Sequence, residues 1–597
     1  MAKAAFFKKD RASREEGKAK GSYSVPCYEI SGAVNKRMKR ILSAFPFKLE
    51  RNLASFLSHA PSRCYGALIL GFGLLSLILY YVGFYGAGHK STPIIAIAAT
   101  VLAMPFLLTD KSLPVVFQEN PITDYLFFEF FCMRRISKSE KQAKSPFVLF
   151  LAFGFALALL GLAVPLWQVV SAVGLLTFAY LSFSSPEFAF FTSFIIMPYS
   201  NYIPYSEIVL PCIVGLTFVS FIRKVMFGKR VLRIERYDII IGVMLLFILI
   251  SGIFVGGSES FAKSVQMIVM AMGYILASNV ITNRRLAESA INSLIFSSTV
   301  PALISIVQII VMAIESKSVV FTKAELNTVF VRTDGLAVFL LAAVVMAFSM
   351  YGHGGRAARR FYGFGLAVNL LALLITGEVF ALIALLISMA TYRAIKAHRR
   401  VGITLAVLML LPYGLLLLPN SYLDALLSLS STPLNTAAEL MALWKGSLIA
   451  FGNNLILGIG MGADSFAEEM AQLGIHGYPD SSNLFIEIGL EAGLFALVCF
   501  VILLIVRVRH RRGYYLYIRS SQFSSVSRAG GACMIAMLSF GAVNYIWSDL
   551  SVFYIFWTVF GIGSAALRNS KREHDDLVFY YDHTRALDSS AIDVEIG

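Results

Sequence analysis

The polar side chains with the clearest chemical use lie around a short turn, 477–482, that precedes an apolar segment. His476 and Asp480 stand four residues apart there, and imidazole and carboxylate groups often act as general bases. A further carboxyl group, Glu378, interrupts the apolar stretch 361–392, with no basic residue within ten positions. An ionisable residue in such a stretch usually faces a partner or a cavity. The alternatives are that the first turn is a plain solvated loop and that the turn at Glu378 reaches water.

Two cations could bind a phosphate group. Arg332 opens an apolar segment, and its guanidinium fork matches phosphate oxygens, each charge-assisted hydrogen bond being worth roughly 1.5–3 kcal/mol. Lys445 lies in a stretch with helical spacing of apolar residues. For both residues the alternative is a snorkelling side chain that keeps its charge at the membrane interface. We therefore treat Arg332 and Lys445 as candidate substrate-binding residues, with anchoring as the alternative.

Gly458, Gly460 and Gly462 form a short glycine-rich stretch. A phosphate-binding loop needs a strand before it and a helix after it, and that context is missing, so a sharp turn is the better interpretation. The six cysteines include no pair at C-x-x-C spacing. We therefore predict neither a disulfide nor a metal site built on cysteine.

The composition decides the class of protein. Of 597 residues, 57% are hydrophobic and 15% charged, and the mean hydropathy is +0.72, whereas soluble proteins have about 45–50% apolar and about 25% charged residues. This excludes a soluble multidomain enzyme. The net charge of +15 could suggest nucleic acid as a partner. However, the bases stand in short clusters between apolar segments, which is the pattern of cytoplasmic loops, so we expect no nucleic acid.

We predict an all-α, polytopic transmembrane helical bundle of 12–16 spans, because a span needs about 20 apolar residues. Residues 1–64 are expected to form a basic cytoplasmic tail with a membrane-surface helix over 34–57. Residues 65–567 would be the membrane domain, and 568–597 a cytoplasmic C-terminal tail. The sixteen candidate spans lie near 65–86, 92–109, 146–164, 167–185, 187–200, 205–222, 238–256, 262–281, 289–314, 332–351, 361–375, 379–392, 401–418, 484–507, 528–547 and 549–567.

The basic clusters fix the expected orientation. Alternating spans from a cytoplasmic N-terminus put every cluster on the cytoplasmic side, in agreement with the positive-inside rule. The longest outer segment, about 419–483, is then a large extracytoplasmic loop. We expect it to carry interfacial helices over 432–450 and 465–473 and to be the functional region.

Residues 444–504 resemble the O-antigen ligase and O-antigen polymerase family of bacterial membrane proteins. That family has a Trp in a surface helix, a Gly-Val-Gly-like turn followed by Phe, and a His-Asn pair followed after nine residues by Gly-x-x-Gly. The matching residues here are Trp444, Gly458-Ile-Gly460, Phe466, Ser482-Asn483 and Gly493-Leu-Phe-Ala496. Ser482 stands where the ligases have His, and Ala496 replaces the last Gly.

Two upstream segments extend the resemblance. Arg332-Thr-Asp-Gly335 is similar to the family's Arg-x-x-Gly at the outer start of a helix, and Leu373-Leu-Ile-Thr376 is similar to its Leu-x-x-Thr segment. The family often continues there with Ser-Arg, where this chain has Glu378-Val379. An arginine that usually binds phosphate in the family is therefore missing.

The resemblance implies glycosyl transfer, without a metal or other cofactor, on the outer face of the bacterial cytoplasmic membrane. The donor would be an oligosaccharide linked to undecaprenyl pyrophosphate, and the acceptor a hydroxyl group. Arg332 and Lys445 would bind the pyrophosphate, and Ser482 and Asn483 would line the substrate site. With the ligase-type His absent, His476, Asp480 or Glu378 would be the base.

Because that His is absent, the sequence favours a polymerase of capsule, exopolysaccharide or O-antigen repeat units. The alternatives are a ligase that transfers glycan to a lipid or protein acceptor, and a non-catalytic or transport protein on the same scaffold. The expected partners are the lipid-linked oligosaccharide, membrane lipids and other membrane proteins of polysaccharide assembly.

Overall fold

The structure is a computed structural model. It describes residues 8–9, 28–30, 56–57, 60–84, 92–133, 135, 146–202, 205–227, 229–316, 333–353, 355–397, 419–429, 434, 436–514 and 522–595. Arg332, the span expected at 401–418 and most of the surface helix expected at 34–57 lie outside these residues.

Among the described residues, ten helices are long and apolar enough to cross a membrane. The protein is thus a polytopic helical membrane protein, as its composition predicted. Backbone groups in a bilayer must pair within their own segment, so each apolar run forms a helix. The ten are α4 (Ser62–Tyr81), α9 (Leu166–Ser184), α11 (Ser206–Met226), α12 (Arg236–Phe254), α13 (Gly257–Val280), α14 (Arg284–Ser316), α15 (Thr333–Tyr351), α16 (Arg356–Ile375), α22 (Leu484–Tyr514) and α24 (Leu550–Glu595).

Shorter elements complete the fold. Three of them are apolar: α5 (Thr92–Leu107), α8 (Phe147–Leu160) and α17 (Val379–Ala397). The others are α6 (Leu113–Glu119), α7 (Pro121–Thr123), the π-helical turn η2 (Asp124–Phe130), α10 (Pro186–Ile196), the 3₁₀ turn η3 (Met197–Tyr202), α19 (Asn420–Leu429), α20 (Ala437–Asn453), α21 (Ala463–Gln472) and α23 (Gln522–Gly541).

The chain forms two compact units. Unit 1 contains residues 1–31, 190–225 and 229–597, and unit 2 contains residues 32–189 and 226–228. The expected membrane domain, 65–567, contains residues of both units. Hydropathy identifies apolar helices but carries no information on which of them pack together, so the division could not be predicted.

Small residues bring the helices of unit 2 together. A methyl group on Gly154 of α8 would lie 2.2 Å from the carbonyl oxygen of Leu68 in α4, and one on Gly73 would lie 2.5 Å from Oγ1 of Thr100 in α5. Membrane helices associate through such close backbone approaches, since lipid chains are as apolar as the side chains they replace.

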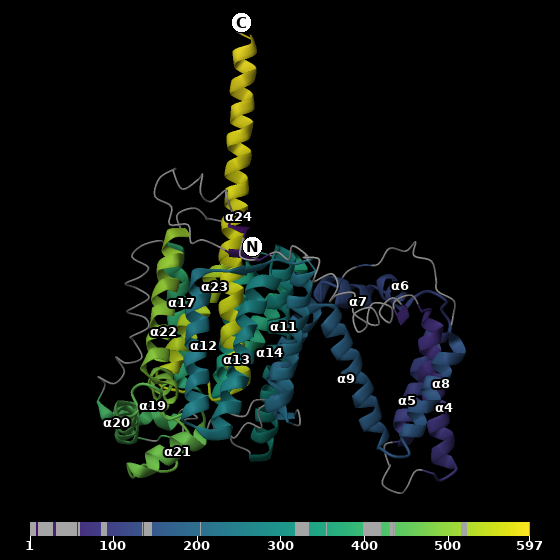
Figure 1. The fold of residues 1–597 in the computed structure, drawn as a ribbon, viewed down its shortest axis with the longest axis horizontal. Coiled ribbons are helices and arrows are strands. Elements are labelled where there is room, and N and C mark those ends of the chain that lie inside the picture. Colours follow the sequence, from purple (N-terminus) through teal and green to yellow (C-terminus); the bar gives the residue numbers. More distant parts are fainter. Residues whose placement is uncertain are drawn as a thin grey trace, which may run out of the picture. The chain divides into compact units, whose positions relative to one another are not determined.

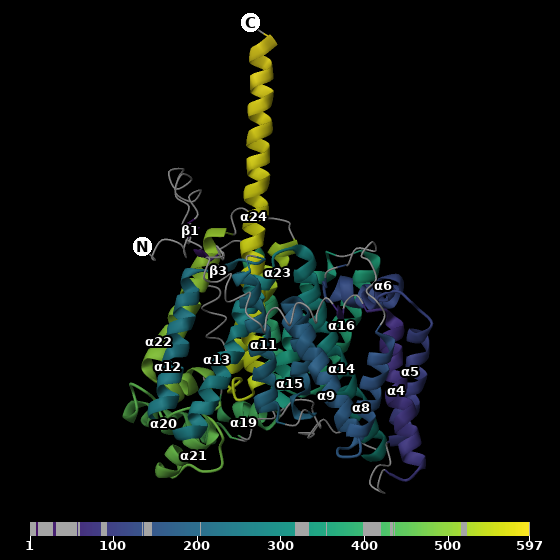
Figure 2. The ribbon, with the colours of Figure 1, turned by 45° about the vertical axis from the view of Figure 1, so that its right-hand side comes forward.

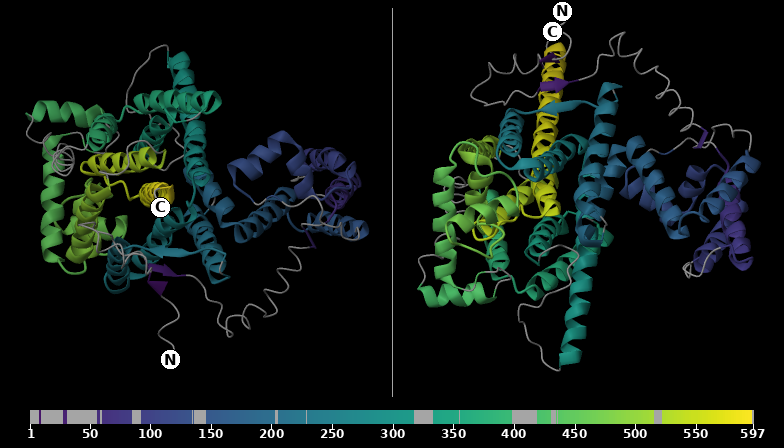
Figure 3. Two further views of the ribbon diagram at one scale, coloured as in Figure 1. Left: turned by 90° about the horizontal axis from the view of Figure 1, so that it is seen from above. Right: turned by 60° about the horizontal axis from the view of Figure 1, so that its bottom comes forward.

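In unit 1, α24 lies among the other helices, as the view along its axis shows (Figure 3, left). Its residues from Leu550 to Leu567 are all buried. Close crossings explain this burial: a methyl group on Gly561 of α24 would lie 2.6 Å from the carbonyl oxygen of Tyr274 in α13. Trp547 and Trp557 add an aromatic cluster with ring centroids 6.0 Å apart. Unit 1 is thus built around α24.

Successive helices of unit 1 run in alternate directions between two ends. β3 (Leu232–Ile234) and the projecting C-terminal part of α24 lie at one end, whereas α19, α20 and α21 lie at the other (Figures 1 and 2). We call the first the basic end, because arginines gather there: Arg233 in β3, Arg284 and Arg356 at the first positions of α14 and α16, and Arg568 within α24. We call the second the loop end; it comprises 420–483 and the 542–549 segment.

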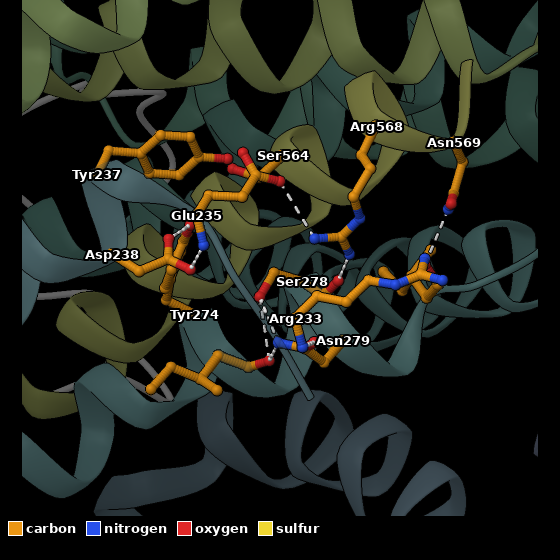
Figure 4. Close-up of polar contacts among 12 residues, drawn as sticks. Arg233, Glu235, Tyr237, Asp238, Tyr274, Ser278, Asn279, Ser564, Arg568 and Asn569 are labelled. Carbon is orange, nitrogen blue, oxygen red and sulfur yellow. Dashed lines mark hydrogen bonds and ion pairs between the residues drawn. The ribbon is translucent and has the colours of Figure 1, made fainter. Parts of the chain in front are cut away.

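At the basic end, polar contacts join the turn between β3 and α12 to α13 and α24 (Figure 4). Nη1 of Arg568 lies 3.2 Å from Oε1 of Glu235, and Nη2 of Arg568 donates to the carbonyl oxygen of Ser278. The backbone N–H of Arg233 donates to Oδ1 of Asn279 at 2.7 Å. This network fixes the start of α12 and the end of α13 to α24.

Two features depart from the predicted tails. β1 (Lys8–Lys9) and β2 (Tyr28–Ile30) of the N-terminal segment form an antiparallel sheet with β3, in the order β1-β2-β3. This sheet is the exception to the all-α prediction within the described chain. The expected C-terminal tail instead continues α24 as far as Glu595. Hydropathy does not reveal such pairing or helical continuation in polar segments.

The expected helices near the loop end are confirmed in part. The expected segments 432–450 and 465–473 overlap α20 and α21, while α19 was not expected. The stretch 361–392 holds two helices, α16 and α17. The candidate at 187–200 is only α10, of 11 residues, followed by η3. The candidate at 528–547 overlaps α23, which is buried along its length.

Candidate functional site

The turn before α22 is tied to the start of that helix. Oδ1 of Asn483 accepts hydrogen bonds from the backbone N–H groups of Phe485 and Ile486 at 3.0 and 3.2 Å. Nδ2 of Asn483 donates to the carbonyl oxygen of Ala542 at 2.8 Å. Asn483 is therefore the N-cap that satisfies orphan donors of α22.

Asp480 lies in the same turn and is 3% exposed. Its Oδ1 accepts a hydrogen bond from the backbone N–H of Ser482 at 2.9 Å. Ser482 is also buried and has a left-handed φ of +52°, a conformation that is uncommon outside glycine. The side chain of Asp480 thus holds its own turn in a fixed shape.

Two more buried carboxyl groups lie on the first turns of α22. Oε2 of Glu487 accepts the backbone N–H of Ser481 at 2.8 Å. Oε1 of Glu491 accepts the N–H of Gly462 at 3.0 Å, and its Oε2 accepts the phenol of Tyr545 at 2.5 Å. Asp480, Glu487 and Glu491 are close enough to interact electrostatically. We call these three residues the acidic cluster.

The glycine-rich stretch packs into a break in α22. Gly493 has a φ of +81° inside the helix, and a methyl group there would lie 2.1 Å from the carbonyl oxygen of Ile456. The break leaves carbonyl groups of the helix free to accept other hydrogen bonds. The backbone N–H of Ile459 donates to the carbonyl oxygen of Leu490 at 2.8 Å. Gly458 has a φ of +73°, and a methyl group on it would lie 2.4 Å from the carbonyl oxygen of Leu490, so a side chain is excluded there. The predicted sharp turn is confirmed.

The segment between α23 and α24 covers the acidic cluster. Burial, and the negative charge of the Glu491 carboxylate, raise the pKa of Tyr545 well above its usual value, so the phenol keeps its proton and donates to Glu491. Burial also raises the pKa of Asp549. Nζ of Lys263 donates to the carbonyl oxygen of Ser548 at 3.4 Å, and its charge acts on both Glu491 and Asp549. Lys263 is thus a cation of the site.

The structure brings some of the predicted site residues together. Asp480, Ser482 and Asn483 lie buried in one turn, whereas His476 and Lys445 are exposed. Glu378 begins α17 and is 0% exposed, which excludes the alternative that its turn places it in water. Arg332 lies outside the described residues.

Glu487, Glu491, Tyr545 and Lys263 were not predicted. Glu487 and Glu491 could have been identified from the sequence, since two ionisable residues four apart in an apolar span mark a functional position. No sequence pattern identifies Tyr545 and Lys263, because they reach the acidic cluster only through the tertiary fold. No group of three or more His, Cys, Asp or Glu side chains in the described ranges is arranged to hold a metal ion.

No protein-family model and no curated protein matches the sequence. The resemblance of residues 444–504 to the O-antigen ligase and polymerase family therefore stays a prediction.

We expect Asn483→Ala to lower stability while leaving some activity. Loss of an N-cap costs about 0.5–2 kcal/mol, and this variant also loses the hydrogen bond to Ala542. Thr436→Ala is a matched control, because among the described residues the Thr436 side chain caps α20 by accepting the N–H of Glu439. The melting temperature of the purified protein should fall further for Asn483→Ala. Equal decreases would mean that the bond to Ala542 adds nothing.

Proposed function

We propose that the protein is a membrane glycan polymerase that joins oligosaccharide repeat units carried on undecaprenyl pyrophosphate. The observation that carries the proposal is the buried acidic cluster at the loop end, opposite the arginines of the basic end. Every described residue of the 444–504 resemblance lies in or next to this region: Trp444 on α20, the glycine turn, the Asn483 cap and the break at Gly493.

The reaction needs a base and a stabilised leaving group. The acceptor hydroxyl oxygen forms a bond to the anomeric carbon of the donor, and the bond from that carbon to the pyrophosphate oxygen breaks. The electron pair leaves with the lipid pyrophosphate, and the hydroxyl proton passes to the base. Asp480 is our first choice, because a carboxylate has about four acceptor positions and the turn places it beside the positions that match the family's His-Asn pair.

Cations are needed for the departing pyrophosphate. Arg332 remains the first candidate from the sequence. Lys263 is a second candidate, since it lies near the start of α13 at the loop end and its charge acts on Glu491 of the acidic cluster. Lys445 is exposed on α20, where it could meet only a substrate that extends to the surface.

The break in α22 favours one alternative, a transport protein. Transporters place broken helices and buried charges at a substrate site, where unwound carbonyl groups coordinate an ion. Here the carbonyl oxygen of Glu491 already accepts hydrogen bonds from Oγ of Ser251 at 2.7 Å and from the N–H of Gly460 at 3.2 Å. Because these acceptors are occupied, we prefer a catalytic site to an ion path.

The envelope glycan of a deletion strain tests the proposal. Single repeat units that remain on lipid would support a polymerase. Long chains that are not attached to an acceptor would indicate a ligase instead. An unchanged glycan would exclude both enzymes and leave the transport alternative.

We also propose that the loop end faces outward from the cytoplasmic membrane and that both termini face the cytoplasm, because the basic end carries the arginine clusters. Cysteines introduced at Ser428 and at Arg572, both exposed, test this orientation. An impermeant thiol reagent applied to whole cells should label Ser428→Cys but not Arg572→Cys, with wild-type protein as background. Labelling of Arg572→Cys alone would reverse the topology.

A further inference from the structure

We infer that the loop end holds a saccharide-binding subsite between the first turns of α22 and the 541–549 segment, in which the side-chain amide of Asn544 binds sugar hydroxyl groups. The inference rests on the proposed function and adds to it: it assigns the acidic cluster to the sugar part of the substrate and not to the pyrophosphate.

The position of Asn544 follows from its neighbours in the chain. A methyl group on Gly541 would lie 3.1 Å from Cβ of Leu484. Ala542 accepts the hydrogen bond from Asn483, and Tyr545 donates to Glu491. The 541–545 stretch therefore runs along the first turns of α22, and Asn544 directly precedes Tyr545, which contacts the acidic cluster.

The amide of Asn544 lacks hydrogen-bond partners. The residue is 1% exposed, and neither Nδ2 nor Oδ1 has a partner within the described chain. Nε1 of Trp547, three residues further on, is also buried without a partner. Nearly all buried polar groups in native proteins are paired, because an unpaired one costs its full desolvation free energy. An unpaired amide beside a candidate active site therefore indicates a ligand that supplies the partners.

The unpaired atoms limit the chemistry of that ligand. A cation could use only Oδ1 of Asn544. A phosphate could use only Nδ2, and the carboxyl groups of the acidic cluster would repel it. A hydroxyl group both donates and accepts, so neighbouring hydroxyls of one sugar can satisfy both ends of the amide and also donate to carboxylates. An uncharged, hydroxyl-rich saccharide is therefore the class of ligand that fits.

Binding to the full-length protein in lipid nanodiscs tests the inference. The probe is the free repeat-unit oligosaccharide, released by mild acid from the lipid-linked intermediate of a deletion strain, and inorganic pyrophosphate is the comparison. By calorimetry, wild-type protein should bind the oligosaccharide, and Asn544→Leu should weaken that binding about tenfold because two hydrogen bonds are lost. Affinity for pyrophosphate should not change.

Melting temperatures of the ligand-free proteins separate binding from folding. Asn544→Leu should melt at the wild-type temperature or above, because it removes an unpaired amide and keeps the volume. Asn279→Leu is the matched control: that buried amide is paired at both ends, with Arg233 and Ile275, so this variant should melt lower and bind the oligosaccharide normally.

Three results would overturn the inference: no oligosaccharide binding by wild-type protein, unchanged binding by Asn544→Leu, or a clear drop in its ligand-free melting temperature, which would mean that the amide already has a partner. None of these decides the proposed function, because polymer assembly is measured separately in the deletion strain.

Discussion

Asp480→Asn should give a folded protein that assembles almost no polymer. The amide keeps an oxygen that can accept the N–H of Ser482, so the turn should hold its shape while the base is lost. Loss of general acid–base catalysis typically lowers the rate of the chemical step by roughly 10²–10⁴-fold. The measurement is polymer formed from lipid-linked repeat units by membrane vesicles, normalised to the amount of protein.

His476→Ala is the control for this variant, because His476 belongs to the same loop but is exposed. We expect it to retain most of the activity. An inactive His476→Ala beside an active Asp480→Asn would assign the base to the histidine. Full activity in both variants would move the assignment to Glu378, the remaining predicted base, which is buried at the start of α17.

Gly493→Ala should greatly reduce the amount of folded protein. The left-handed φ of +81° costs a residue with a side chain roughly 1–3 kcal/mol. The new methyl group would also lie 2.1 Å from the carbonyl oxygen of Ile456, a backbone atom that cannot move without displacing the glycine turn. The measurements are the yield of monodisperse protein after detergent extraction and its melting temperature.

Gly477→Ala separates the effect of backbone strain from the effect of the steric contact. Gly477 has a φ of +88°, but a methyl group there would have no neighbour within 4 Å, so this variant should carry only the backbone strain. Gly174→Ala, in an open position within α9, should be neutral or stabilising, since alanine is favoured over glycine in helices. If Gly493→Ala were no worse than Gly477→Ala, α22 would not need its close contact with 456–457.

The sequence was sufficient for features that depend on local patterns. Long apolar runs predicted most of the membrane helices, because a bilayer leaves no other backbone conformation for a single segment. The alternating glycines predicted the turn at 458–462. These features need only neighbouring residues, so they can be read without the tertiary fold.

Features that depend on distant partners could not be predicted. Tyr545 donates to Glu491 across 54 positions of the chain, and no local pattern in either segment predicts this contact. Glu487 and Glu491 were visible as charged residues in an apolar span, yet their role appears only when the turn at 480–483 and the glycine stretch fold against them. The strands of the N-terminal segment depend on β3, more than 200 positions away.

The continuous helix α24 links the two sides of the membrane mechanically. Its 46 residues span about 69 Å at 1.5 Å per residue, more than twice the hydrocarbon thickness of about 30 Å. It contains no proline, the usual cause of a sharp bend. Its first turn follows Asp549, beside the acidic cluster, and its far end projects beyond the basic end. Rotation or tilt imposed on that projecting part would therefore be transmitted along the helix to the residues around the acidic cluster.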